Sequence, residues 1–472
     1  MILVYFLCAC IIIGLIYKAT RQEKIFDLTF IFLVAQAMFL LYTILRKNST
    51  ETGIFTYDSL GILFFGVLVL VAFAVFYHSK KYLDREDVKQ TGLYNIAFVS
   101  LCASITGAYF SNNVTATWVL IEATTLGSAV LIYHRRTERA LEAAWKYVFV
   151  CSIGILIAYL GILFLSTVLK NHHGNMSFGS LSEAIPTANP LYLKLAFVLV
   201  LTGYSCKMEY FPLYPIGIDA NHVTPTPMSA FFSTAMVNLG FVSIFRIYSL
   251  LFDSPIFSWA QNVMFVAGFT SLLVAAVYIA QVEHCKRLLA YSTVENMGIA
   301  LLILSTGEIG AFYAIFHVLM HSFVKSTAFM RLSVIGKTYG SYKLENLGGY
   351  RQISPKGSLI LILCLLGLTA IPPSALFISE IYVFSALSKN IIALILLIPI
   401  ICIILYFLCT KLLKIVYGDK PENIVFEKED KLTLWIQFVL LAIFFFFGMY
   451  QPQWLTDMIL ECKQDIFVTL WR

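Results

Sequence analysis

The chain has 472 residues, of which 59% are hydrophobic and only 13% are charged, with a net charge of +6; soluble domains carry about 25% charged residues. Runs of about 20 apolar residues recur from end to end, and each run is long enough to cross a hydrocarbon layer of ~30 Å. The composition predicts an all-α polytopic membrane protein and excludes soluble enzymes, nucleic-acid-binding modules and disulfide scaffolds.

The apolar runs predict about fourteen transmembrane helices. They are expected at 1–17, 27–45, 59–77, 92–110, 114–133, 147–168, 191–208, 228–251, 257–280, 286–306, 308–330, 357–388, 392–417 and 432–449. The first run has no basic segment ahead of it and no small-residue cleavage site, so we expect a retained helix rather than a signal peptide. The tail 451–472 is expected to lie at the membrane interface, because it mixes polar residues with Trp454, Leu455, Phe467 and Trp471.

The basic residues of the loops predict the orientation, because cytoplasmic loops of membrane proteins carry an excess of Lys and Arg. Most of the 33 basic residues fall in one set of alternate loops: Lys18, Arg21, Lys24, Lys80, Lys81, Arg85, Lys89, Arg135, Arg136, Arg139, Lys286, Arg287, Arg331, Lys337, Lys343, Arg351, Lys356, Lys411, Lys414, Lys420, Lys428 and Lys431. The opposite loops hold Arg46, Lys47, Lys170, Lys194 and Lys389. Both termini are therefore predicted on the non-cytoplasmic side, which agrees with an even number of spans.

Two of the apolar runs are interrupted by proline and glycine. The first is LVLTGYSCKMEYFPLYPIGIDANHVTPTP, with Gly203, Pro212 and Pro215, and the second is LLGLTAIPPSALFISE, with Pro372 and Pro373. Proline removes a helical hydrogen-bond donor, and irregular backbone at membrane depth survives only where it is buried or lines a wet cavity. One broken helix in each half of the chain predicts a transporter built from two inverted repeats.

Ionisable residues inside the apolar runs are the candidate functional residues, since each costs about 2.5–3.5 kcal/mol at a helix centre on insertion scales. Glu122 lies near the middle of the fifth expected span, and a neighbouring hydroxyl could instead neutralise it. Lys146 opens the sixth span, where it could also extend to the interface. Lys207 lies at the first interruption, where a lysine without a carboxylate partner could switch between its charged and neutral forms.

His317, His321 and Lys325 follow a four-residue step, so they lie on one face of the eleventh expected helix. This ladder favours a proton relay over ordinary packing, and over a metal site because no third ligand is apparent. Glu380 follows the second interruption and could also be a structural carboxylate at a helix end. Arg246, for which the alternative is a role as an ion-pair partner only, and Glu295 complete the polar set. A mixed row of acids and bases in a dry interior suits proton transfer better than binding of an organic solute.

Five ordered stretches resemble a known family. They are KMEYFPLYPIGIDANHVTPTPMSAFFSTAMVNLG, CKRLLAYSTVENMG, HVLMHSFVKSTAFM, LENLGGY and GLTAIPPSALFISE, and with the intervening chain they cover roughly residues 90–385. The sequence is identified as a member of the antiporter-like membrane subunits shared by respiratory complex I, Mrp-type cation/proton antiporters and membrane-bound NiFe hydrogenases. Within this family, the sequence is most similar to the F subunit of hydrogenase-4 and of formate-hydrogenlyase complexes. The stretches that carry this similarity are IEATTL, RRTERALEAAWKY and MHSFVKS.

The resemblance implies roles for these residues. Glu122 and Lys207 would be the paired acid and base of a first half-channel, Lys325 the central relay lysine, and Glu380 the terminal group of a second half-channel. It also implies a division into N-terminal helices (1–90), a first half-channel repeat (91–251), a second half-channel repeat (252–417), and a C-terminal helix with an interfacial tail (418–472). Within each repeat, five helices including one broken helix are expected.

Two positions and one short stretch depart from the family pattern. Asn238 stands where complex I subunits often have lysine in the eighth span, and Asn296 stands where a histidine often follows the AYSS motif. The stretch from Pro212 to Ile216 lacks the family's histidine and tryptophan. The resemblance therefore implies a relay between Lys207 and Lys325 with fewer titratable groups than usual.

The sequence as a whole predicts a proton-translocating subunit of a multi-subunit, redox-driven complex in the cell (inner or cytoplasmic) membrane. Its ten cysteines are scattered without the spacing of a metal or cluster site, so we expect no metal, cofactor or redox centre in this chain. Its expected partners are membrane lipid, other membrane subunits, and a peripheral arm carrying NiFe and Fe–S centres, with no nucleic acid. The alternatives are a Na⁺/H⁺ antiporter subunit and a non-pumping scaffold for that arm.

Overall fold

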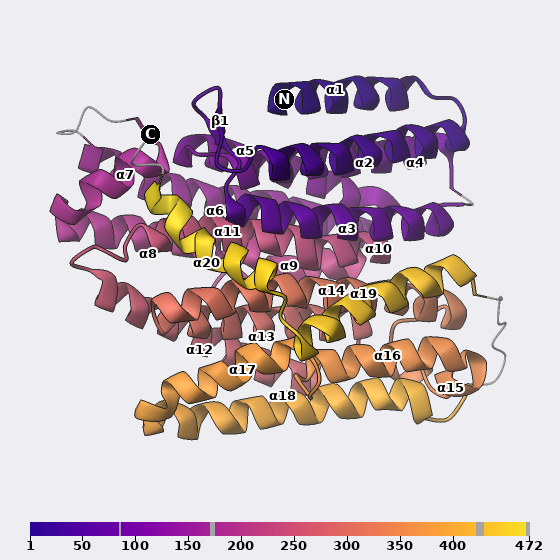
Figure 1. The fold of residues 1–472 in the computed structure, drawn as a ribbon. Coiled ribbons are helices and arrows are strands. Elements are labelled where there is room, and N and C mark those ends of the chain that lie inside the picture. The colour runs from indigo at the N-terminus through magenta and orange to yellow at the C-terminus, as the bar shows by residue number, and fades with distance from the viewer. Residues whose placement is uncertain (85, 170–174, 422–428, 469–472) are drawn as a thin grey trace.

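The structure, a computed structural model, describes residues 1–84, 86–169, 175–421 and 429–468, and nearly all of this chain is helical (Figure 1). In chain order the elements are α1 (Ile2–Lys18), α2 (Gln22–Leu45), β1 (Thr50–Glu51), β2 (Phe55–Thr56), α3 (Ser59–Tyr82), α4 (Val88–Phe110), α5 (Val114–Ile132), η1 (Tyr133–Arg135), α6 (Glu138–Val168), α7 (Phe178–Ala184), η3 (Ile185–Thr187), α8 (Pro190–Met208), α9 (Pro215–Val223), α10 (Thr226–Phe231), η4 (Phe232–Met236), α11 (Val237–Ser249), α12 (Phe257–Gln281), α13 (Cys285–Ser305), α14 (Glu308–Tyr339), η5 (Leu344–Asn346), α15 (Tyr350–Ile353), α16 (Pro355–Leu368), α17 (Ala375–Ala386), η6 (Leu387–Lys389), α18 (Ile391–Tyr417), α19 (Lys431–Met449) and α20 (Gln453–Val468). Arg85, Lys170, Lys428 and Trp471, with the side chains of Lys389 and Phe467, lie outside the described part.

Eleven helices of the described chain are long and apolar enough to cross a membrane, so the prediction of an all-α polytopic membrane protein is confirmed. The three other expected spans also fall on helices. The first is α1, which has 17 residues, and the twelfth is the pair α16 and α17, which are short helices in tandem. The eleventh is α14, which has 32 residues but is not apolar enough to be counted among the eleven helices that could cross a membrane.

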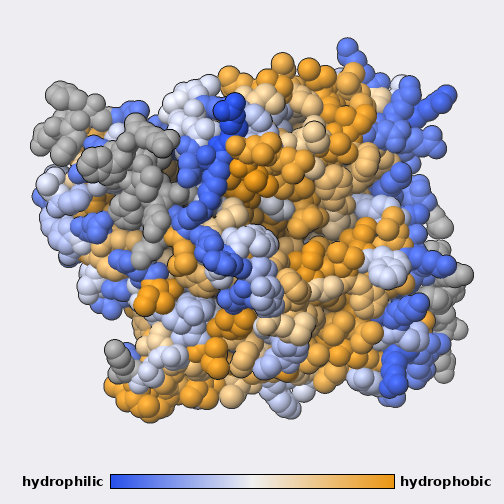
Figure 2. Space-filling model, in the orientation of Figure 1, coloured by the Kyte–Doolittle hydropathy of each residue, from blue (hydrophilic) through white to orange (hydrophobic). Residues whose placement is uncertain are grey.

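The outer surface of the bundle is apolar, as a lipid-facing surface must be. Figure 2 shows a broad hydrophobic band across the middle of the visible face, with hydrophilic side chains gathered toward its left and right edges. Large apolar side chains point outward from peripheral helices, for example Leu7 of α1, Phe149 of α6 and Ile395 of α18. Such helices satisfy their own backbone hydrogen bonds and can therefore face hydrocarbon on one side.

The centre of the bundle is formed by helices that are buried on all sides. The segment α10–η4–α11 is buried throughout, and α13 and the middle of α14 are almost completely buried. The N-terminal helices α1 to α3 lie at one edge and α18 at the opposite edge, while α20 crosses the bundle obliquely (Figure 1). Leu455 and Ile459 of α20 are buried, whereas Trp454 is exposed, so the expected interfacial tail is an amphipathic helix with its apolar side against the protein.

Both interruptions predicted from proline are present. α8 ends at Met208 and α9 begins at Pro215; α16 ends at Leu368 and α17 begins at Ala375. Proline suits the first turn of a helix because its missing N–H needs no partner there, and Ser374 caps α17 by accepting a hydrogen bond from the Phe377 N–H.

The helix that contains the sixth expected span begins nine residues before that span. α6 begins at Glu138, where Thr137 caps it by accepting a hydrogen bond from the Ala140 N–H. The polar stretch before residue 147 continues the helix, because helix propensity and capping do not depend on whether the residues lie in hydrocarbon. Lys146 therefore lies two turns inside α6 rather than at the beginning of a span.

Candidate functional site

Lys207 is buried at the C-terminal end of α8, with only 2% of its surface exposed. Its ammonium group donates hydrogen bonds to the hydroxyl groups of Thr125 (2.9 Å) and Tyr147 (3.3 Å), and it lies 5.2 Å from the centre of the Tyr147 ring. All of these contacts are with neutral groups. A buried ammonium held without a contacting carboxylate is sensitive to any charge that changes nearby.

Glu122 is half-buried on α5 and is not ion-paired with Lys207 in the described chain. It accepts a hydrogen bond from the Ser152 hydroxyl of α6 (2.9 Å). The implied pairing of acid and base is therefore not a contact in this structure, and Thr125 occupies the place beside the ammonium group. The involvement of Glu122 in proton transfer remains a prediction.

Lys146 is separate from the buried set, contrary to the expectation that it belongs to the interior row. Its side chain is 51% exposed and pairs with Glu142 one turn earlier on α6. The face of α6 that packs on α8 includes Tyr147 and Cys151, so the neighbouring residue 146 points outward. Helical periodicity, with successive side chains about 100° apart, accounts for the difference.

The ladder predicted on α14 is fully buried. His317, His321 and Lys325 each have 0% exposure. The Nδ1 atom of His317 lies 2.8 Å from the hydroxyl oxygen of Ser379 on α17. The ring nitrogens of His321 and the ammonium nitrogen of Lys325 have no hydrogen-bond partner within the described protein. Titratable groups buried in this way respond strongly to the charge of their neighbours.

Two carboxyl groups act electrostatically on Lys325: Glu295 of α13, which is 3% exposed, and Glu209, which is 5% exposed. Glu380 of α17 in turn interacts electrostatically with Glu295. Acids and bases of α13, α14 and α17, together with Glu209 of the α8–α9 break, therefore influence one another electrostatically. Glu295, which was expected only as a supporting residue, is thus one of the two acids that act electrostatically on Lys325.

The other supporting residues make structural contacts. Arg246 of α11 binds both carboxylate oxygens of Asp58 (2.9 and 2.8 Å), which confirms the ion-pair alternative. Asn238 exchanges hydrogen bonds with Ser322 of α14 at 2.8 and 3.1 Å. Asn296 donates to the Ser292 carbonyl (2.7 Å) and to Glu295 (3.4 Å). None of these amide groups can take up a proton near neutral pH.

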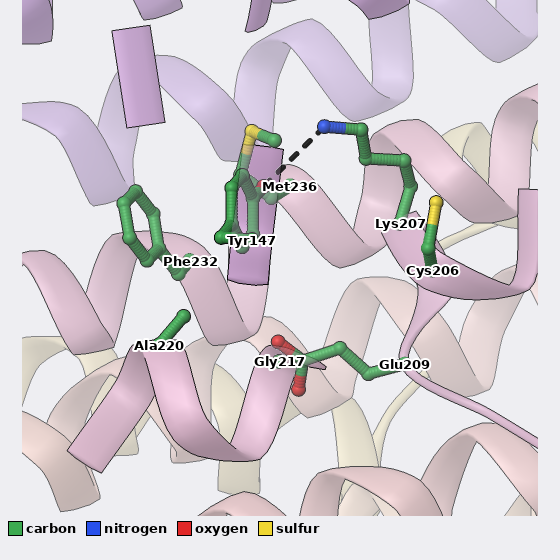
Figure 3. A pocket seen from close by; sticks show the side chains of 8 residues that line it. All are labelled: Tyr147, Cys206, Lys207, Glu209, Gly217, Ala220, Phe232 and Met236. Carbon is green, nitrogen blue, oxygen red and sulfur yellow. Dashed lines mark hydrogen bonds between the residues drawn. The ribbon is translucent and has the colours of Figure 1, made fainter. Parts of the chain in front are cut away.

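Glu209 was missed in the sequence, although it lies within the quoted KMEYFP stretch. Its carboxylate accepts a hydrogen bond from the Asn221 side chain of α9 (3.2 Å). It borders a small cavity, whose lining is Tyr147, Cys206, Lys207, Glu209, Gly217, Ala220, Phe232 and Met236 (Figure 3). The insertion cost that singled out Lys207 applies equally to a glutamate in the interruption, so the signal was available.

Among the described residues, no three His, Cys, Asp or Glu side chains lie together as metal ligands would. His317 and His321 are the pair considered from the sequence. The structure gives His317 a serine partner instead.

The fold and the site define an integral membrane protein with two broken helices and an interior row of titratable side chains. Residues 111–405 match the family described as NADH:quinone oxidoreductase/Mrp antiporter, TM. Since the match covers more than half of the chain, the chain belongs to this family of antiporter-like transmembrane subunits, and the resemblance drawn from its motifs is confirmed.

Individual relatives agree with this assignment. A hydrogenase-4 component F homolog from Methylacidiphilum infernorum is 28% identical over 361 residues, covering 74% of this chain and 75% of the relative. An NAD(P)H-quinone oxidoreductase subunit 2 from Synechococcus elongatus is 27% identical over 382 residues, covering 80% of this chain and 72% of the relative. The fold is shared with a chain of the membrane-bound sulfane sulfur reductase, an archaeal respiratory membrane complex, with a TM-score of 0.87 and 21% identity over 98% of this chain and 96% of that chain.

Proposed function

We propose that this chain translocates protons across a membrane as a subunit of a multi-subunit, redox-driven complex, of the hydrogenase-4/formate-hydrogenlyase or complex I type. The observation that carries the proposal is the fully buried ladder His317–His321–Lys325, whose lysine is under the electrostatic influence of Glu295 and Glu209. Family membership and the names of the relatives support the type of complex.

The arrangement can move protons because each buried group changes the proton affinity of its neighbours. In a medium of low dielectric constant, a proton added to Glu295 removes a negative charge that stabilises the ammonium form of Lys325. A change of charge at one end of the row therefore alters proton occupancy at the next group. Lys207 begins the row in the first half, and Glu380 ends it beside Glu295.

We propose that the chain crosses the membrane fourteen times, with α16 and α17 together forming one broken span. Two inverted five-helix repeats, 91–251 and 252–417, would each contain one break, between α8 and α9 and between α16 and α17. The distribution of basic residues supports a location in the cell (inner or cytoplasmic) membrane with both termini on the non-cytoplasmic side.

Electron transfer belongs, in this proposal, to partner subunits. A peripheral arm with NiFe and Fe–S centres and further membrane subunits would complete the complex, and this chain would conduct protons. A Na⁺/H⁺ antiporter subunit is the second candidate, because the matching family includes Mrp antiporters. Sodium requires several oxygen ligands converging on one point.

The test is proton flux into vesicles that contain the whole complex. Lys207→Ala is expected to abolish flux while leaving assembly intact. Lys194→Ala is the matched control, since Lys194 lies on the same helix but over the ring of Trp259, 5.4 Å from its centre. Flux that survives Lys207→Ala, with only assembly impaired, would support a scaffold instead. Flux that follows the sodium concentration at constant pH would support the antiporter.

A further inference from the structure

Glu209 occupies a backbone position that glutamate rarely takes. It follows the last residue of α8 in the left-handed conformation, with φ 59° and ψ 48°. Glycine or asparagine usually occupies this position, because a longer side chain crowds the backbone there. The side chain is nevertheless buried at membrane depth, where an ionisable group is costly. A residue that is unfavourable in both respects calls for a functional explanation.

The surroundings leave space for this carboxyl group. A Cβ atom at Gly217 of α9 would lie 2.5 Å from the carboxyl carbon and from Oε1 of Glu209, so any side chain there would displace the carboxyl group. Asn221, one turn later on α9, donates its hydrogen bond to the same Oε1 atom. The Oε2 atom has no partner among the described protein atoms. One oxygen is thus held in place and the other is available for proton exchange.

Glu209 is linked to both lysines of the proposed pathway, to Lys207 by a shared cavity and to Lys325 by its charge. Lys207 and Glu209 border the same cavity, in which the ammonium group is directed toward Tyr147 and the carboxyl group toward Gly217 (Figure 3). The cavity holds about 10 Å³ of water-accessible space, which is roughly the room that one water molecule needs. The charge of Glu209 also acts on Lys325 of α14.

Other side chains in this region are poor proton carriers. Phe232 and Met236, which border the cavity on η4, are apolar. Tyr147 and Cys206 carry a hydroxyl and a thiol that do not readily ionise near neutral pH. Asn238 is an amide engaged with Ser322. Of the described residues that border the cavity, Glu209 is the one carboxylate.

We propose that Glu209 is a proton-binding site that connects the two half-channels by carrying the proton between Lys207 and Lys325. In the first step the Lys207 ammonium releases a proton across the cavity, which leaves a neutral amine and a neutral Glu209 carboxylic acid. In the second step Glu209 gives that proton to the neutral amine of Lys325 and becomes a carboxylate again. This inference rests on the proposed function and adds the group that joins its two halves.

The test is Glu209→Gln in the complete complex reconstituted in vesicles. Glutamine has the same size and can still accept a hydrogen bond from Asn221, but it cannot carry a proton. We expect proton flux to fall roughly 100-fold, the lower end of what one positioned proton-transfer group contributes, with assembly unchanged. Glu345→Gln is the matched control, because Glu345 is 64% exposed on the short helix η5. An infrared band from a protonated carboxyl group should appear in the wild-type complex and be absent in Glu209→Gln.

Comparison with the two lysines separates this inference from the proposed function. If Lys207→Ala and Lys325→Ala abolish flux but Glu209→Gln retains it, the role of Glu209 is refuted and the proposed function stands. If none of the three changes lowers flux, the proposed function fails. Should Glu209→Gln fail to assemble, Asn221→Ala removes the hydrogen bond to Oε1 and leaves the carboxyl group in place. It must then shift the carboxyl band and slow proton flux, and an unchanged band and rate would overturn the proposal.

Discussion

The buried ion pair between Arg331 of α14 and Glu429 makes a stringent prediction about stability. Arg331 is completely buried, and its guanidinium group donates to Glu429 (2.8 Å), to the Tyr350 hydroxyl (3.0 Å) and to the side-chain oxygen of Gln437 on α19 (2.9 Å). Through these bonds one guanidinium group joins α14, which carries the relay ladder, to α15 and α19. We predict that Glu429→Ala destabilises the folded protein strongly.

The expected loss follows from the burial of both partners. Glu429 is only 9% exposed, so its removal leaves an uncompensated charge inside the protein. Breaking a buried ion pair from one side costs about 3–5 kcal/mol. Because Tyr350 and Gln437 still accept hydrogen bonds from Arg331, we expect the lower end, about 3 kcal/mol, which is roughly a 150-fold change in the ratio of folded to unfolded protein.

The measurement is equilibrium unfolding of the purified protein in detergent. The double variant Arg331→Met/Glu429→Leu is the informative control, since it removes both charges and replaces them with apolar side chains. We expect it to be only about 1–2 kcal/mol less stable than the wild type, because a buried pair exchanged for apolar residues is often neutral, whereas the buried Gln437 oxygen loses its donor. If the single variant were as stable as the wild type, or the double variant as unstable as the single one, the reasoning from the buried charge would be refuted.

The same pair predicts a pH dependence. Burial favours the neutral form of Glu429, but the charge of Arg331 and the hydrogen bonds from Arg331, Ser354 and Tyr350 outweigh it and lower the pKa of Glu429 from its ordinary value of 4.5. A carboxyl group with a lowered pKa in the folded state contributes stability above its unfolded pKa and loses it as the pH falls through the folded value. The stability difference between wild type and Glu429→Gln should therefore be full at neutral pH and shrink once the pH is below 4.5.

Two further substitutions test how the helices are held together. Lys411→Met should lower the free energy of unfolding by about 2 kcal/mol, because the Lys411 ammonium on α18 donates to the carbonyl groups of residues 279, 280 and 282 at the C-terminal end of α12. The measurement is thermal unfolding, and the control is Lys414→Met, since Lys414 is exposed. An equal loss of stability in both variants would contradict the prediction. Gly203→Ala should cost about 1–3 kcal/mol by overpacking, since its Cβ atom would lie 2.4 Å from a backbone oxygen of α6, whereas Gly66→Ala has no atom within 4 Å and should not destabilise.

The helices were predictable from the sequence because hydrocarbon imposes a length on each apolar run, and the two breaks were predictable because proline removes a backbone donor. The ends of helices were less predictable. α6 starts at a polar residue, Glu138, because the cap at Thr137 determines the start and the membrane boundary does not. The amphipathic helix α20 was recognised as peripheral, but the sequence did not indicate that Leu455 and Ile459 pack on the bundle.

In the candidate site, the insertion cost of a charge pointed to side chains that are buried, with Lys146 as the exception, but not to which of them meet. The ladder on α14 was predicted because a regular helix places residues four apart on one face. No such rule relates Lys207 to Glu122 across two helices, and a hydroxyl rather than a carboxylate proved to be the partner of the ammonium group.

Glu209 shows the physical limit of the sequence argument most clearly. It lies in an interruption, where the helical period is lost and the direction of a side chain cannot be inferred from its position along the chain. Its side chain points inward because Glu209 itself adopts the left-handed backbone conformation after α8, and because Gly217, eight positions later on α9, has no side chain. From the sequence alone, a glutamate in a proline-rich break looks like an exposed loop residue. Only the structure shows that Gly217 leaves room for its carboxyl group inside the protein. A break in a membrane helix frees backbone groups and makes room for a side chain that a continuous helix would exclude. Charged residues at such breaks are therefore the first candidates for a role in the protein interior.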